Sequence, residues 1–192
     1  VAKGEIISPR TVNIERAFIH RVLEIAKTQW GWLVKNPVSN IPPLPYHGTR
    51  DRWFTENEEQ ILLLLADHQW LKDIIVFGLY TGFRKGEILS LKWSQVFLDA
   101  DIPFIRLVRE KSKITMDFPL VDDKLLEILH RLSALKQNPD EPVFIDEDNM
   151  PVNKSRLRYC WEKAVKKAGF NDAVFHSLRH TFATRCCRAN MP

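Results

Sequence analysis

The stretch "TGFRKGEILSLKW", residues 81–93, places Arg84 at the start of a short expected helix. Gly82 lets the chain turn sharply, and Arg84 leaves that turn just before the helical residues. Glu87 follows one helical turn later, where its carboxylate can hold the guanidinium in place. An arginine mounted in this way suits bidentate contact with a phosphate. The segment alone leaves open an ordinary surface Arg–Glu pair at a helix start.

Two lysines occupy the middle of a second segment, "REKSKITMDFP", residues 109–119. Strand-type residues flank Lys111 and Lys113, so we expect a hairpin with both lysines in its turn. A lysine at such a tip can enter a DNA groove or reach a reacting oxygen. Most lysine-rich turns are simply solvated, so this segment decides nothing by itself.

The third segment is "FHSLRHTFATRCCRANMP", residues 175–192. His176 and Arg179 lie three positions apart, and therefore share one face at the start of an expected helix. The free backbone N–H groups of a helix start also favour anions. Taken alone, the pattern equally fits a buried histidine with a structural hydrogen bond. His180, beside them, is best interpreted as a packed histidine bonded to nearby backbone.

Hydrophobic periodicity predicts an α+β fold that is mostly helical, with a small antiparallel sheet of about three strands. Strands are expected at 102–108 and 114–120, and the short apolar run 142–145 is a candidate third strand. The expected helices are, in order, one from Pro9 to about Trp30, one capped by Thr55 with Glu58, one over 70–80 ended by Gly82, one over 85–91, one opened by Asp122, one from Asn153 to Gly169, and one from about Ser177.

Composition favours a globular protein that acts on a polyanion. The chain has 192 residues, 45% of them hydrophobic, and lacks both a bilayer-length apolar run and a signal pattern. Its three cysteines make no disulfide framework, which favours a reducing, cytoplasmic setting. Residues 138–151 carry five acids and no base, whereas residues 152–192 carry nine Lys or Arg against two acids. This asymmetry favours nucleic acid as the partner, although a solvated basic face gives the same count.

In their order and spacing, the three segments resemble the tyrosine recombinase (phage integrase) family. The resemblance covers residues 52–192, which would form a truncated catalytic domain. Residues 1–35 resemble the C-terminal part of that family's helical core-binding domain. Residues 36–51, with four prolines within 36–49, are expected to be a linker between the two.

The resemblance implies a role for each residue that matches a motif. Arg84 and Arg179 would clamp the non-bridging oxygens of the scissile phosphate. Lys111, which lies eight residues before Pro119, would be the general acid that protonates the leaving 5′ oxygen. His176 would bind the phosphate and assist proton transfer at the nucleophile. Supporting and DNA-backbone contacts are expected from Glu87, His180, Lys113, Lys154, Arg156 and Arg158.

The implied reaction is site-specific DNA recombination or integration through a 3′-phosphotyrosyl intermediate. It needs no cofactor, neither ATP nor a metal ion, because fixed cations stabilise the charge on the phosphate. A zinc site drawn from His176, His180 and Cys186 has an incomplete ligand set. The implied partners are double-stranded DNA recombination sites and three further copies of the chain, with no membrane and no small-molecule substrate, in a prokaryotic cytoplasm. The alternative is a non-catalytic DNA-binding protein that keeps this fold.

One departure from the family pattern concerns the nucleophile. The family places a second His or Trp and the attacking Tyr well downstream of the second arginine, but only 13 residues follow Arg179. Tyr46, Tyr80 and Tyr159 fall in the linker, an apolar helix and a packed helix, so none is a substitute. The sequence therefore predicts a fragment that lacks its nucleophile and is inactive in cleavage.

Overall fold

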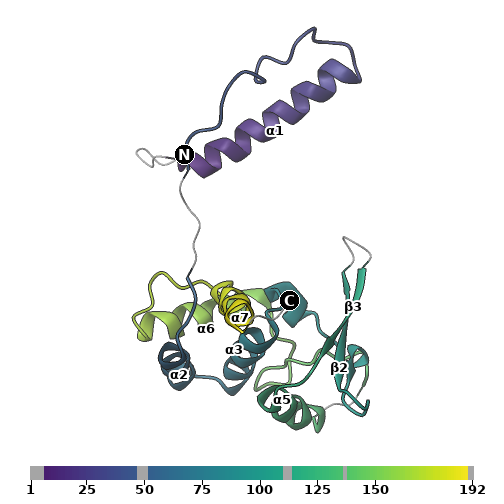
Figure 1. Ribbon diagram of the computed structural model, residues 1–192, viewed down its shortest axis with the longest axis vertical. Helices are drawn as coiled ribbons and strands as arrows, with labels where there is room; N and C mark the ends of the chain where they lie inside the picture. Colours follow the sequence, from purple (N-terminus) through teal and green to yellow (C-terminus); the bar gives the residue numbers. More distant parts are fainter. Residues whose placement is uncertain (1–6, 47–51, 110–113, 136–137, 190–192) are drawn as a thin grey trace. The chain divides into compact units, whose positions relative to one another are not determined.

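The computed structural model describes residues 7–46, 52–109, 114–135 and 138–189. The chain divides into two compact units, unit 1 within residues 1–50 and unit 2 within residues 51–192. Among the described residues, unit 1 contains a single helix, and unit 2 contains the strands and the other helices (Figure 1). Within the described ranges, every helix is too short or too polar to span a bilayer.

Unit 1 is built on α1 (Pro9–Thr28), a helix with a clear start signal. The Ser8 hydroxyl accepts a hydrogen bond from the Thr11 amide at 3.2 Å, and proline occupies the first helical position. The helix ends at Thr28, two residues before the end that the sequence predicted.

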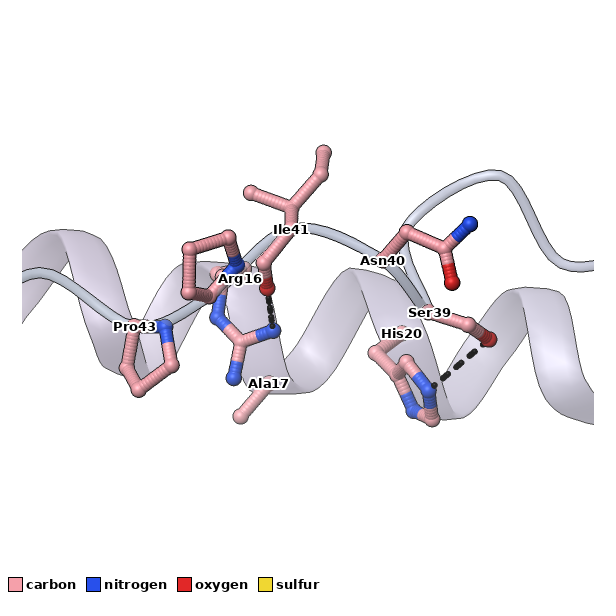
Figure 2. Close-up of a pocket in the computed structure, with 8 residues that line it drawn as sticks. Arg16, Ala17, His20, Ser39, Asn40, Ile41 and Pro43 are labelled. Atoms are coloured by element: carbon pink, nitrogen blue, oxygen red, sulfur yellow. Dashed lines mark hydrogen bonds between the residues drawn. The ribbon is translucent and has the colours of Figure 1, made fainter.

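Residues 36–46, expected as part of a linker, fold back along α1. Asn36 is buried, and its amide donates to the His20 carbonyl at 3.0 Å. Arg16 donates to the Ile41 carbonyl at 2.7 Å, on one side of a shallow pocket of about 430 Å³ (Figure 2). The segment is rich in proline, as expected of a linker. However, Asn13 and Arg16 of α1 form hydrogen bonds with its backbone at Leu44 and Ile41, so it is attached to the helix.

Unit 2 begins with helices whose ends follow local sequence signals. Thr55 and Glu58 form the predicted capping box, with backbone-to-side-chain distances of 3.3 and 2.9 Å. Gly82 ends the apolar helix in the left-handed region at φ 62°, also as predicted. The helices are α2 (Glu56–Leu65), α3 (Gln69–Thr81), α4 (Lys85–Leu89), α5 (Asp123–Ser133), α6 (Lys154–Lys167) and α7 (Ser177–Arg188).

A three-stranded antiparallel sheet packs beside these helices, in the order β1-β2-β3. Its strands are β1 (Val96–Phe97), β2 (Phe104–Arg109) and β3 (Ile114–Pro119). The prediction of a strand at 142–145 was wrong, because those residues form only isolated bridges, such as Lys92 with Pro142. The third strand is β1, which is too short for its periodicity to appear in the sequence.

The core of unit 2 lies around α3, which is buried on nearly every side. α7 packs directly against it (Figure 1). A Cβ added at Gly78 would meet Leu178 of α7 at 3.1 Å, so glycine permits this close approach. The contact matters because α7 carries His176 at its N-cap and Arg179 in its first turn.

Candidate active site

The turn between α3 and α4 holds Arg84 as the N-cap residue of α4. The Arg84 amide donates to Glu87 Oε2 at 2.7 Å, and its guanidinium lies 3.1 Å from Glu87 Oε1. The Arg84 side chain is 55% exposed, whereas that of Glu87 is only 17% exposed. The less exposed Glu87 carboxylate thus orients the Arg84 guanidinium, whose solvent-exposed N–H groups can bind a ligand.

The second arginine is attached to the same turn. Arg179 Nη1 donates a hydrogen bond to the Gly82 carbonyl, two residues before Arg84 in the chain. Phe182, one helical turn after Arg179, packs so tightly on Gly82 that an added Cβ would lie 2.4 Å from the ring. The turn and α7 therefore fit together only because residue 82 is glycine. Two guanidinium groups from distant parts of the sequence share one locality.

His176 lies at the N-cap of α7, within electrostatic range of both arginines. Its ring meets that of His180 edge to face, with centroids 4.8 Å apart. Loss of hydration lowers the pKa of His176 below its ordinary value. The neighbouring His180, and then the cations Arg179 and Arg84, lower that pKa further. The imidazole is therefore mainly neutral at pH 7, and it can accept a proton.

A pair of arginines with an imidazole is a combination of groups that suits a tetrahedral anion. Two arginines supply fixed positive charge with several N–H donors, and the imidazole adds a base that can also become a donor. Among the described residues, no group of three or more His, Cys, Asp or Glu side chains is placed to hold a metal ion. The cluster offers charge stabilisation and proton transfer without such a metal ligand set.

Lys111 and Lys113, the two predicted hairpin lysines, lie outside the described residues. The strands on either side are described, and they pair with Arg109 opposite Ile114. The antiparallel pairing of these two strands is therefore as the sequence predicted.

The three basic residues predicted on α6 have different surroundings. Lys154 and Arg158 are exposed, and Arg158 pairs with Glu162, at 2.7 Å, one turn along the helix. Arg156 instead contacts the acidic loop (residues 138–151), with Nη2 at 2.9 Å from Glu147 Oε2. Its guanidinium already holds that loop to α6.

Sequence reasoning missed two residues, Thr181 and Arg52, that connect residues 52–54 to α7 and to the loop before it. Thr181 is fully buried on α7, and its hydroxyl accepts a hydrogen bond from the Phe54 amide at 2.9 Å. Arg52 joins three parts of unit 2 around one guanidinium. Only an arginine just before the Thr55 capping box was visible in the sequence, and its distant partner Asp172 was not.

Comparison with known protein families identifies the family to which the chain belongs. Residues 52–192 match the phage integrase family. The chain belongs to that family. The match covers the whole of the described part of unit 2, including Arg84, His176 and Arg179.

This integrase-family chain has relatives in phages and bacteria. It is 28% identical to the integrase of Salmonella phage P22 in an alignment of 187 positions that covers 92% of this chain and 46% of that protein. It is 27% identical to the shufflon-specific DNA recombinase of Escherichia coli over 184 residues, 95% of this chain and 45% of that protein. The chain spans about half the length of these curated relatives.

Solved integrases share the fold. A lambda integrase dimer bound to a COC' core site has a TM-score of 0.76 at 18% identity, covering 95% of this chain and 68% of that chain. The Tn1549 transposon integrase in complex with circular intermediate DNA also has a TM-score of 0.76 at 18% identity, covering 97% and 69%. The predicted mostly helical fold with a three-stranded antiparallel sheet is confirmed.

Proposed function

We propose that this integrase-family chain is part of a site-specific recombinase, which cleaves and rejoins DNA strands through a 3′-phosphotyrosyl intermediate. The observation that carries the proposal is the attachment of Arg179 to the Gly82 carbonyl, beside Arg84 and His176. Such a cluster fits one scissile phosphate, with the two guanidinium groups on its non-bridging oxygens. Residues 52–192 would form the catalytic domain, and residues 1–35 the end of a core-binding domain.

The proposed chemistry needs proton transfer at both ends of the reaction. A tyrosine oxygen attacks phosphorus, its proton passes toward the neutral imidazole of His176, and the bond to the 5′ oxygen breaks. Lys111 donates the proton that the leaving oxygen takes up, which yields a free 5′ hydroxyl. Arg84 and Arg179 stabilise the charge that develops on the phosphate oxygens. Glu87 and His180 hold these groups in place.

We propose that the attacking tyrosine is neither Tyr80 nor Tyr159, which lie in the described part of unit 2. The Tyr80 hydroxyl lies 2.8 Å from Lys124 Nζ, and Tyr159 is exposed on α6 among basic side chains. Covalent attack splits the exchange into two reversible steps and conserves the energy of the phosphodiester bond. Neither ATP nor a metal ion is needed for that balance.

The proposed partners are duplex DNA sites and other protomers. Lys113, Lys154 and Arg158 would contact the DNA backbone, and Arg156 would do so only in competition with the acidic loop. Assembly of four protomers is supported by a lambda integrase tetramer bound to a Holliday junction. The proposed setting is the cytoplasm of a prokaryotic cell.

A covalent-trapping experiment tests the proposal. It uses a longer form of the protein that includes a tyrosine beyond residue 192, together with a nicked suicide duplex. We expect a covalent protein–DNA adduct, and we expect Arg179→Ala to slow its formation by about 10²–10³-fold, as for loss of one transition-state donor.

Arg158→Ala is the matched variant. It removes an exposed arginine that is proposed to contact the DNA backbone, so DNA binding should weaken. The slope of log affinity against log salt concentration should become shallower by about one. At saturating DNA, Arg158→Ala should form the covalent adduct at the same rate as the unsubstituted protein. Tight DNA binding without any adduct would indicate a non-catalytic DNA-binding protein with this fold. An adduct that Arg179→Ala leaves undiminished would overturn the assigned site.

A further inference from the structure

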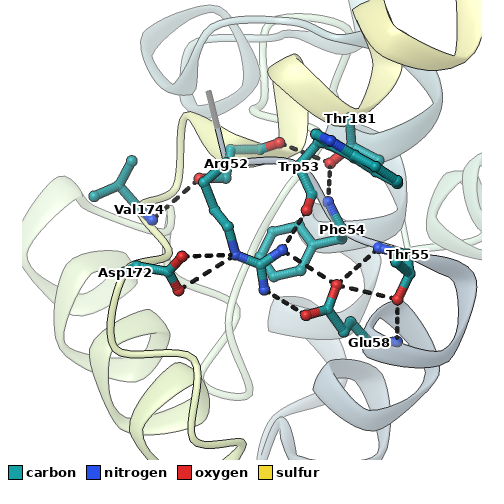
Figure 3. Close-up of polar contacts among 9 residues, drawn as sticks. Arg52, Trp53, Phe54, Thr55, Glu58, Asp172, Val174 and Thr181 are labelled. Atoms are coloured by element: carbon teal, nitrogen blue, oxygen red, sulfur yellow. Dashed lines mark hydrogen bonds and ion pairs between the residues drawn. The ribbon is translucent and has the colours of Figure 1, made fainter. Parts of the chain in front are cut away.

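Arg52 lies at the centre of a polar network at the beginning of unit 2 (Figure 3). Its guanidinium makes two hydrogen bonds to the Glu58 carboxylate, at 2.7 and 3.1 Å. Its Nε also lies 3.2 Å from Asp172 Oδ2. The Arg52 side chain is only 17% exposed, and bonding to Glu58 raises its pKa above the ordinary value. One cation therefore joins the first turn of α2 to the loop between α6 and α7.

Two aromatic rings also lie close to the same guanidinium. The Arg52 guanidinium carbon lies 4.8 Å from the centre of the Phe54 ring and 5.5 Å from that of Phe170. Phe170 belongs to the α6–α7 loop, as Asp172 does. The loop is thus attached to Arg52 at two positions, by charge and by ring contact.

A second connection reaches α7 itself. The Phe54 amide donates to the Thr181 hydroxyl at 2.9 Å, and that hydroxyl donates to the Ser177 carbonyl at 2.8 Å. Figure 3 shows this connection beside the Arg52 network. Residues 52–54 therefore contact both the loop before α7 and the first two turns of α7, where His176 and Arg179 lie.

We propose that Arg52 is a positioning residue for the anion site, because it fixes the α6–α7 loop and thereby the start of α7. Asp172 is only four residues from His176, so a shift of the loop is passed along a short piece of chain. Most backbone bonds of the loop are local turns, such as Ala173 to Phe170 at 3.0 Å. Such turns shape the loop but do not attach it to α2.

Arginine is required at residue 52 for a geometric reason. Its planar fork serves Glu58 and Asp172 together, and its guanidinium stays within cation–π distance of the Phe54 and Phe170 rings. A lysine keeps the charge, but it has a single nitrogen and no flat face. Arg52→Lys should therefore release the loop while leaving the net charge of the chain unchanged.

The first test is the pKa of the His176 imidazole, measured by NMR titration of the 192-residue chain without DNA. In the wild-type chain the pKa is lowered by lost hydration and then by His180, Arg179 and Arg84. If Arg52 positions the loop, Arg52→Lys lets His176 move outward, and its pKa rises toward the ordinary value. Arg158→Lys changes an exposed ion pair on α6 and should leave the titration unmoved.

Sulfate binding to the same samples gives the second readout, and it rests on the proposed function. Arg52→Lys should weaken sulfate binding by roughly tenfold, the size of one lost charge-assisted hydrogen bond. Should Arg52→Lys fail to fold, Asp172→Ala replaces it, because it removes the polar connection to the loop and leaves the pair of Arg52 with Glu58 intact. An unchanged His176 pKa in a folded variant overturns the positioning role. Absence of sulfate binding by the wild-type chain counts against the anion site instead, and the titration still decides the role of Arg52.

Discussion

Arg84 and Arg179 meet at one locality, but the protein supports them in opposite ways. Arg84 begins a helix of only five residues, its side chain is 55% exposed, and one carboxylate orients it. Arg179 lies in the first turn of a helix of twelve residues, and its guanidinium is attached to the carbonyl of Gly82. The first arginine depends on its own turn, and the second depends on how two long helices pack.

This difference explains where the site is vulnerable. Changes near Arg84 act on a local pair, which a surface environment and salt already weaken. Changes at the contact of α3 with α7 alter packing, which adjusts only at considerable cost. The contact at Gly82 belongs to both regions, since its carbonyl holds Arg179 and its turn presents Arg84.

The largest effect is therefore expected from Gly82→Ala. The residue has φ 62°, and the new Cβ would lie 2.4 Å from the Phe182 ring. We expect a loss of about 2–5 kcal/mol in the free energy of unfolding, from the left-handed backbone and the overpacking together. Chemical denaturation measures this loss.

Gly86→Ala is the matched control for that change. Nothing lies within 4 Å of a Cβ at Gly86, which occupies the first turn of α4. Alanine there should leave stability unchanged or raise it by up to about 1 kcal/mol. Equal losses from the two substitutions would contradict the special fit at Gly82.

The next effect separates the two arginines by their response to lysine. Arg179→Lys cannot keep both the bond to Gly82 and a forked contact with an anion, so sulfate affinity should fall by about tenfold. Arg84→Lys keeps a flexible cation near Glu87, and the loss should be about threefold. Isothermal titration of the folded variants measures both constants. A larger loss from Arg84→Lys would reverse the proposed ranking.

The sequence predicted the local features of the fold, because their causes lie within a few residues. The capping box of Thr55 and Glu58 and the helix stop at Gly82 need no distant partner. The family motifs also drew attention to Arg84, His176 and Arg179 before any geometry was known. Their assigned chemical roles stay predictions.

Long-range partners were beyond the reach of the sequence. The hydrogen bond of Thr181 to the Phe54 amide joins positions 127 residues apart, and that of Arg52 to Asp172 spans 120. The hydrophobic periodicity of the sequence does not indicate either of these two pairs. Arg156 shows the same difficulty, since a basic residue on a helix suggests DNA, yet its guanidinium binds the acidic loop.

A smaller effect concerns pH, and its sign follows from the lowered pKa of His176. The free folded chain binds fewer protons at this ring than the unfolded chain, so His176 makes stability fall as pH falls below the ordinary pKa of about 6.5. A bound anion favours the imidazolium and raises that pKa again. Sulfate keeps its charge between about pH 5 and 8, so its affinity should rise several-fold as pH falls through this window. His176→Asn should remove most of the slope, and an unchanged slope would mean that another group titrates.

The smallest effect is expected from Glu87→Gln, which tests whether Arg84 depends on charge or on local hydrogen bonding. The amide oxygen of glutamine can still accept from the Arg84 backbone N–H, so the start of α4 should persist. Only the ion pair with the exposed guanidinium is lost, at a cost of about 0.2–1 kcal/mol. Glu87→Ala removes the capping contact as well and should cost about 0.5–2 kcal/mol. Thermal unfolding of both variants at low and high salt separates the terms, since the glutamine deficit should disappear as salt rises, whereas the alanine deficit should shrink only to its capping part. A glutamine variant as unstable as the alanine variant would mean that Arg84, like Arg179, depends on a buried interaction and not on its own turn.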